Sequence, residues 1–339
     1  MIFEIFIAIA GIGAALSLLP SLYMAAKFSY ANARFSAIEP IFLKEKEIAR
    51  LLDCKNLDEF KNNVVSKDFV LYGENALQIQ ESIDESHRKI IIMAMNDSPK
   101  SVRKFYKLWL KKIEIEKLKY AIEKKMHGEE FELKVFDKEI REIIEELKRG
   151  EERKLKEIFN VSLDMPFEEI ERGIDKKIIN ELLELNLPRH SRKAKNKFIR
   201  SMIDIMNIKS ILRGKYYKLK DIEKNIIPHG WELAEWQIDR LLKIDSISEI
   251  ISLLEGTSYY APLKEAIVDF EKEGVIAFER AIDKHLLDIS CLMANENPLA
   301  LGPGIRFLIE KEFEVKNLRA ISKGIEEKMT DFVKPMVVA

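Results

Sequence analysis

The chain has 339 residues, enough for two or three domains, and a third of the residues are charged. Glycine (13) and proline (10) are sparse, which together with abundant Lys and Glu is typical of long solvated helices. The charges nearly cancel, at a net −1, which argues against a globally basic nucleic-acid-binding protein. The only cysteines, Cys54 and Cys291, lie far apart, so neither a disulfide framework nor a structural zinc site is expected and a reduced cytoplasmic setting is the default.

Residues 5–26 carry no charge and have about the length that crosses a bilayer. We predict a transmembrane helix within residues 1–28; a cleaved signal peptide and a helix buried in a partner protein are the alternatives. No Lys or Arg precedes the apolar run, which argues against a signal peptide. Lys27, Arg34, Lys44 and Lys46 follow it, so the positive-inside rule leaves the bulk of the chain on the cytoplasmic face of the cell membrane.

The remaining chain shows helical periodicity and no sustained alternation, so we predict an all-α fold with essentially no sheet. Turn and cap signals predict a helical pattern over 30–52, a helix capped by Asn56, and further helices over 75–96, 100–125 and 136–156. Another helix begins at Pro166-Phe167, one includes Trp231 and Trp236, and a short one covers 246–254. Residues 295–304 are predicted as a loop before a last long helix over 301–324.

One helical pattern occurs three times, at 113–125, 203–215 and 313–325, and the copies align without gaps. Each copy has an apolar residue, an acid and an apolar residue in succession, then a further apolar residue three places on and a cation directly after it. The acids are Glu114, Asp204 and Glu314, and each lies three residues before Lys117, Asn207 or Asn317, near enough on a helix to pair with it. A core-facing stripe with a solvated polar edge explains any single copy.

The repetition of this helix predicts an internally triplicated chain. With the breaks that the turn signals suggest, we predict repeat units at 29–128, 129–222 and 223–339, after the N-terminal segment 1–28.

Six basic residues crowd into the stretch 189–200: Arg189, Arg192, Lys193, Lys195, Lys197 and Arg200. Such a run can contact nucleic acid or an acidic lipid surface. It lacks interleaved aromatic residues in a chain that is otherwise neutral, so we favour a solvated helix face or a protein contact.

No catalytic, cofactor or metal motif is evident. The five histidines are scattered without metal-ligand spacing, and neither a G-x-S-x-G elbow nor a P-loop occurs. Gly302-Pro303-Gly304 lacks a nearby Lys-Ser/Thr pair, so we interpret it as a turn with proline at a helix start rather than as a phosphate site.

Three motifs together resemble the C subunit of archaeal A-type (V/A-type) ATP synthases, which is related to the d subunit of the eukaryotic V-ATPase. They are Tyr30-Ala31-Asn32-Ala33-Arg34, the turn Gly256-Thr257-Ser258-Tyr259, and Gly302-Pro303 followed by Glu312-Phe313-Glu314-Val315-Lys316-Asn317-Leu318-Arg319. The resemblance extends from about residue 30 to residue 329 and makes these residues candidate family-signature positions.

The resemblance implies a funnel of three pseudo-symmetric helical units that serves as a non-catalytic rotor part. Such a protein is present in one copy on the cytoplasmic end of the proteolipid ring, holds the central shaft made of the D and F subunits, and needs no cofactor, metal ion or nucleic acid. We further expect the N-terminal helix to enter the lumen of the ring. A membrane-anchored helical scaffold for another complex is the alternative, and an enzyme is less favoured.

Overall fold

The computed structural model describes residues 19, 22–23 and 25–339. Across these residues the chain forms helices joined by irregular segments, without a strand, which confirms the all-α class. The predicted transmembrane segment lies mostly outside the described residues. None of the described helices combines the length and apolar character that a membrane crossing requires. The N-terminal membrane span therefore stays a prediction.

The chain folds into two compact units. Unit 1 contains the described residues up to Val102 together with Leu187–Phe198 and Ile251–Ala339. Unit 2 contains Arg103–Asn186 and Ile199–Ile250. The boundaries predicted for three consecutive repeat units stay a prediction.

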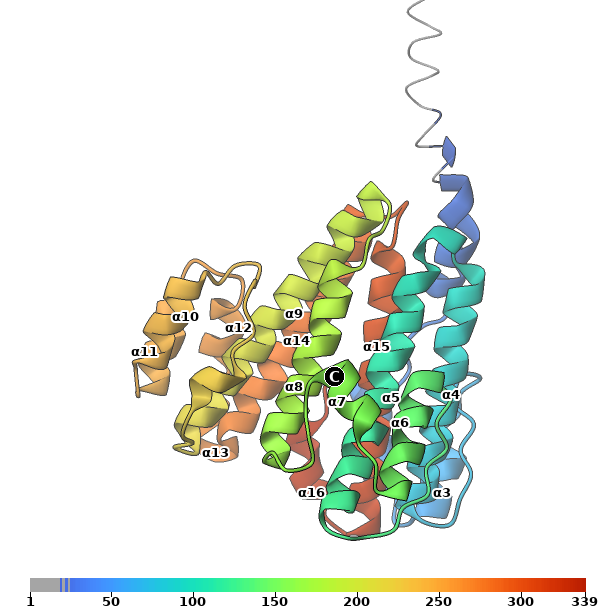
Figure 1. Cartoon of the computed structure of the whole chain (residues 1–339). Coiled ribbons are helices and arrows are strands. Elements are labelled where there is room, and N and C mark those ends of the chain that lie inside the picture. The colour runs from blue at the N-terminus through green and yellow to red at the C-terminus, as the bar shows by residue number, and fades with distance from the viewer. Residues whose placement is uncertain (1–18, 20–21, 24) are drawn as a thin grey trace, which may run out of the picture. The chain divides into compact units, whose positions relative to one another are not determined.

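Unit 1 is organised around the long helix α15 (Gly302–Glu326), which packs between α14 (Val275–Glu296) and α4 (Ala76–Asp97) (Figure 1). Phe307, Leu308 and Ile309 of α15 are consecutive and all buried, so the helix is enclosed on more than one side. The other elements of unit 1 are a helical stretch at 25–37, α2 (Glu45–Leu52), α3 (Leu57–Asn63), η1 (Lys100–Val102), α12 (Tyr260–Glu265), α13 (Ile267–Glu273), α16 (Thr330–Val333) and η3 (Lys334–Met336).

The start of α15 depends on a glycine. A Cβ atom on Gly302 would lie 2.2 Å from the carbonyl oxygen of Met293, so only glycine allows α15 to begin this close to α14. Pro303 follows in the first turn, where its missing N–H costs nothing.

In unit 2, α5 (Arg103–Met126) packs against α6 (Lys138–Arg149) and α8 (Phe167–Glu184), with α7 (Arg153–Phe159) between them in the chain. Trp109, Ile115 and Leu118 of α5 are fully buried in this core. Helix α9 (Arg189–Tyr216) begins in unit 1 and ends in unit 2, where η2 (Ile222–Asn225) and α10 (Glu235–Leu242) follow, and α11 (Ile247–Leu253) lies at the boundary.

Two predicted helices prove to be interrupted. The helical pattern over 30–52 is wrong at 38–44, where the chain is irregular before α2, because Pro40 disfavours helix at the residue before it. The helix predicted over 136–156 is two helices, since Gly150 adopts a left-handed conformation (φ 82°) that ends α6. Trp231 precedes α10 rather than lying within it. The predicted cap is confirmed, because Asn56 accepts a hydrogen bond from the Glu59 N–H.

Candidate functional site

The three acids of the repeated helix are buried. Glu114 on α5 is 5% exposed, and Asp204 on α9 and Glu314 on α15 are both 0% exposed. The expected solvated polar edge is therefore wrong at these positions. A buried carboxylate needs strong hydrogen-bond donors, because leaving it unpaired away from water would cost several kcal/mol.

In each copy the donors are consecutive backbone amides. Glu114 accepts from the N–H groups of Phe136 and Asp137. Asp204 Oδ2 accepts from Trp231 and Glu232 at 2.8 and 2.7 Å. Glu314 Oε1 accepts from Ile41 and Phe42 at 2.6 and 2.9 Å. The three acids thus share one local setting, which we call the carboxylate clamp, as the repeat in the sequence predicts.

Each clamp fixes the chain just before a short helix: α6 for Glu114, α10 for Asp204 and α2 for Glu314. In the first two clamps the amides follow the acid by 22 and 27 residues in the sequence. In the third clamp the acid on the last long helix and its amides near the start of the chain are 273 residues apart. The third clamp therefore joins residues near the two ends of the sequence.

Two of the clamped helices, α2 and α10, share a second pattern, which the pattern of the long helices alone does not predict. Each begins with an acid, followed by a buried Ile three residues on and a buried Leu three residues after that. The two sets are Glu45, Ile48 and Leu51, and Glu235, Ile238 and Leu241. A search of the sequence for a second repeated pattern, in addition to that of the long helices, could have found it.

The expected pairing of each acid with the residue three places on is wrong. Lys117 instead donates to the carbonyl of Lys134, and Asn207 exchanges two hydrogen bonds with the backbone of Ile227. Asn317 donates to the carbonyls of Phe42 and Val338 and accepts from the Val338 N–H. This position therefore helps to hold the same irregular segment as the acid.

The clamp on α15 has an additional cation. Lys311, whose side chain is 2% exposed, lies 2.7 Å from Glu314 Oε2 and 2.8 Å from Asp68 Oδ2. One turn before Glu314, burial raises the pKa of Glu310 above its ordinary value of 4.5, while a 2.7 Å hydrogen bond from Arg306 opposes the rise.

The candidate signature residues all lie in unit 1, and several of them make contacts between separate segments of the chain. Asn32 donates to the carbonyl of Pro298, just before α15, and Arg34 pairs with Asp97 at 2.8 Å. Arg319 lies 3.6 Å from Asp84 of α4. The structure does not bring these residues together into one site.

The others have separate settings. Leu318 and Tyr259 are fully buried, and Tyr259 contacts the ring of His285. Thr257 donates to the carbonyl of Leu254, and Glu312 lies 3.8 Å from Lys316. Tyr30 and Ala33 are exposed.

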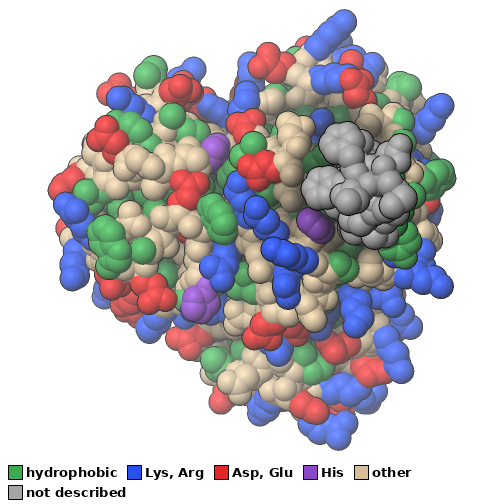
Figure 2. Space-filling model, turned by 90° about the horizontal axis from the view of Figure 1, so that it is seen from above, with side chains coloured by type: hydrophobic (Ala, Val, Ile, Leu, Met, Phe, Trp, Pro, Cys, Tyr) green, Lys and Arg blue, Asp and Glu red, His purple; other side chains and the backbone are tan. Residues whose placement is uncertain are grey.

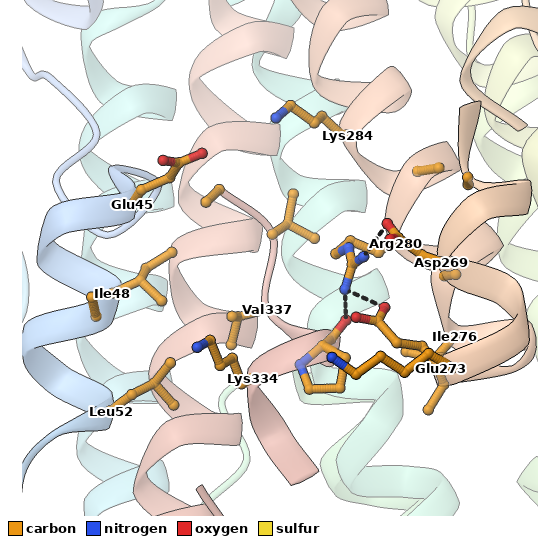
Figure 3. Close-up of a pocket in the computed structure, with 18 of the residues that line it drawn as sticks. Glu45, Ile48, Leu52, Asp269, Glu273, Ile276, Arg280, Lys284, Lys334 and Val337 are labelled. Atoms are coloured by element: carbon orange, nitrogen blue, oxygen red, sulfur yellow. Dashed lines mark hydrogen bonds and ion pairs between the residues drawn. The ribbon is translucent and has the colours of Figure 1, made fainter. Parts of the chain in front are cut away.

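Unit 1 also contains an open groove of about 1140 Å³. One wall is α2, which presents Glu45, Ile48 and Leu52 along one face (Figure 3). Residues of α12, α13 and α14 and the last residues of the chain form the rest. Its lining is mixed, with apolar residues such as Ile276 and Val337 among charged ones such as Asp269 and Lys284. A groove with both apolar and charged residues can take a helix of another protein.

Arg280 holds the groove walls together. It pairs with Glu273 at 2.7 Å and Asp269 at 3.2 Å, both on α13, and donates to the carbonyl of Pro335 (Figure 3). Lys284 and Lys334 are exposed and have no ion-pair partner among the described residues. No group of His, Cys, Asp and Glu in the described part of the chain could hold a metal ion.

The described residues thus form an all-helical protein with the same carboxylate clamp at three places and an open groove in unit 1. The profile of the ATP synthase (C/AC39) subunit family matches residues 31–334. The chain is 30% identical to the C subunit of the A-type ATP synthase of Methanothermobacter thermautotrophicus, over 88% of this chain and 84% of that protein. It is 28% identical to the C subunit of the A-type ATP synthase of Methanocaldococcus jannaschii, over 93% of this chain and 87% of that protein. It is 26% identical to the C subunit of Pyrococcus abyssi, over 91% of this chain and 88% of that protein. The chain belongs to the ATP synthase (C/AC39) subunit family.

Proposed function

We propose that this chain is a non-catalytic central-stalk subunit of an A-type ATP synthase, which couples the central shaft to the membrane proteolipid ring. It would be present in one copy per complex, with the D and F subunits and the ring as its partners. Its bulk would lie on the cytoplasmic face, with the apolar N-terminal segment in the membrane. The family membership supports the proposal that the chain is part of an ATP synthase complex. The carboxylate clamps support the proposal that its role is mechanical.

A rotor coupling has to transmit torque without yielding. Exposed ion pairs contribute only about 0–1 kcal/mol each, whereas hydrogen bonds to a charged group contribute about 1.5–3 kcal/mol. Each clamp applies two such bonds at the entry of a short helix, so these helices are fixed to the long helices more firmly than surface pairs could fix them. These paired hydrogen bonds to buried carboxylates are the observation that favours a mechanical part.

The groove of unit 1 is our candidate for a contact with the shaft. Single cysteines at Lys284 and Lys334, cross-linked in detergent-solubilised membranes, should give adducts with shaft proteins, while a control cysteine at the exposed Glu74 in the same unit should not. The intact complex, weighed by native mass spectrometry, should contain one copy of this chain. Co-purification with unrelated proteins and without shaft and proteolipid would favour the scaffold alternative and refute the proposal.

A further inference from the structure

One end of unit 1 is built from four separate chain segments: the helical stretch 25–34, residues 97–102, the start of α9 at 187–198, and residues 291–306 (Figure 1). Specific contacts join them. Asn32 donates to the Pro298 carbonyl, Arg34 pairs with Asp97, and Lys197 pairs with Glu296. We call this surface the basic end.

Positive charge accumulates at the basic end. Its four segments contain nine Lys and Arg residues and only two acids, in a chain whose net charge is −1. Both acids, Asp97 and Glu296, are already in ion pairs. Five cations have no acidic partner among the described residues and are exposed: Lys27, Lys100, Arg189, Arg192 and Lys193. Figure 2 shows the protein from this end, and several Lys and Arg side chains lie near the middle of that face.

Three of these cations lie in the first turns of α9, where the positive end of the helix dipole opposes them. The first turn of α9 contains no acidic residue that would offset these charges. A diffuse anionic surface outside the protein would offset them. Such a surface would also suit a mixture of Lys and Arg from several segments better than one bidentate carboxylate would.

Two further observations indicate which anionic surface this is. Lys27 directly follows the uncharged stretch 5–26, and at about 1.5 Å per helical residue Arg34 lies only about 10 Å further along. Tyr23 and Tyr30, two turns apart on the same side of this segment, are 60% and 63% exposed. Exposed tyrosines beside an apolar helix end are typical of the boundary between a membrane and water.

We infer that the basic end binds the headgroups of anionic lipids at the membrane surface, through Lys27, Lys100, Arg189, Arg192 and Lys193. This inference rests on the membrane anchoring proposed above. It adds a lipid contact that holds unit 1 against the bilayer surface, independent of the contacts with protein partners.

The test uses the full chain in a neutral detergent, with equal amounts of phosphatidylglycerol and phosphatidylcholine, and counts bound lipids by native mass spectrometry. The wild type should retain phosphatidylglycerol in preference, and salt should weaken this preference because it screens the charges. Each cation near an anionic surface contributes a factor of about five in affinity, so Arg189→Gln/Arg192→Gln/Lys193→Gln should bind phosphatidylglycerol about a hundredfold more weakly.

The matched control is Lys46→Gln/Lys55→Gln/Lys67→Gln, which removes three exposed cations without ion-pair partners from other segments of unit 1. It should retain the wild-type preference. The melting temperature of both variants should confirm that they are folded.

Equal retention of the two lipids by the wild type, or equal losses in the two variants, would overturn the inference. So would an unchanged lipid preference in the α9 variant together with loss of an acidic protein partner, since the basic end would then be a protein contact. Co-purification with shaft and proteolipid is scored separately, so a failure of the proposed function is distinguishable from a failure of the lipid contact.

Discussion

Replacing Asp204 by Ala tests the carboxylate clamp most directly. Asp204 is completely buried and accepts two amide hydrogen bonds at 2.8 and 2.7 Å; a third amide, that of Leu233, is too far at 3.4 Å to contribute much. Two hydrogen bonds to a charged acceptor contribute about 3–6 kcal/mol together, a large part of a typical unfolding free energy of about 5–15 kcal/mol. We therefore expect Asp204→Ala to destabilise unit 2 by about 3–6 kcal/mol.

Hydrogen exchange measured by mass spectrometry would locate this effect. In the wild type the amides of Trp231 and Glu232 and the following helix α10 should exchange slowly. In Asp204→Ala they should exchange much faster than the core of α5, because the clamp holds the segment that leads into α10. Urea unfolding would give the size of the loss.

Two variants serve as controls. Asp204→Asn keeps the shape and one acceptor oxygen, so it should lose less stability than the alanine variant. Asp239→Asn changes an exposed acid of α10 itself and should leave both measurements within about 0.5 kcal/mol of the wild type. Unchanged exchange at 231–242 in Asp204→Ala would refute the reasoning, even if the protein were globally less stable.

Two other predictions concern α15. Gly302→Ala should lower the unfolding free energy by about 1–3 kcal/mol in urea, because the new Cβ meets the Met293 carbonyl oxygen at 2.2 Å. Gly324→Ala should cost less, because its nearest neighbour is a side-chain carbon of Val333 at 2.7 Å rather than a backbone atom. Glu310 has its pKa raised by burial in the folded protein, so the folded state binds more protons and its stability falls as pH rises through and above 4.5. Urea titrations between pH 4 and 7 should show this fall in the wild type relative to Glu310→Gln, and a parallel pH dependence of the two proteins would contradict it.

The helical class and the threefold pattern could be predicted because both are local. Apolar residues at i and i+3 repeat in the sequence itself, and no tertiary information is needed to align Glu114, Asp204 and Glu314. Their burial could not be predicted in this way, since an acid beside an apolar stripe is normally solvated. What keeps these carboxylates inside is an amide pair that comes from another part of the chain.

The groove could not be predicted from the sequence either, because distant parts of the chain form it. Its walls come from α2 near the start of the chain, α13 and α14 in the last third, and the final residues. Nothing local marks Arg280 as the residue that joins them, because its partners Asp269 and Pro335 are 11 and 55 residues away. The basic end is an intermediate case. The charges of α9 were evident in the sequence, but not that Lys195 is buried and Lys197 pairs with Glu296, while Arg189, Arg192 and Lys193 are exposed.

The three clamps make the opening prediction comparative. Glu114→Ala should release the segment before α6, and Glu314→Ala the segment before α2, if the same pair of bonds does the same work in each copy. The third variant should have a second effect, because Lys311 would keep only Asp68 as a partner and would become an incompletely paired buried cation. Since the Glu314 clamp joins residues 273 positions apart, it is expected to form late in folding, so its loss should speed unfolding and local exchange more than it slows refolding. Suppose that exchange becomes faster at α6 in Glu114→Ala and at α10 in Asp204→Ala, but not at α2 in Glu314→Ala. The last long helix would then hold the start of the chain by other contacts, and the three clamps would not be equivalent.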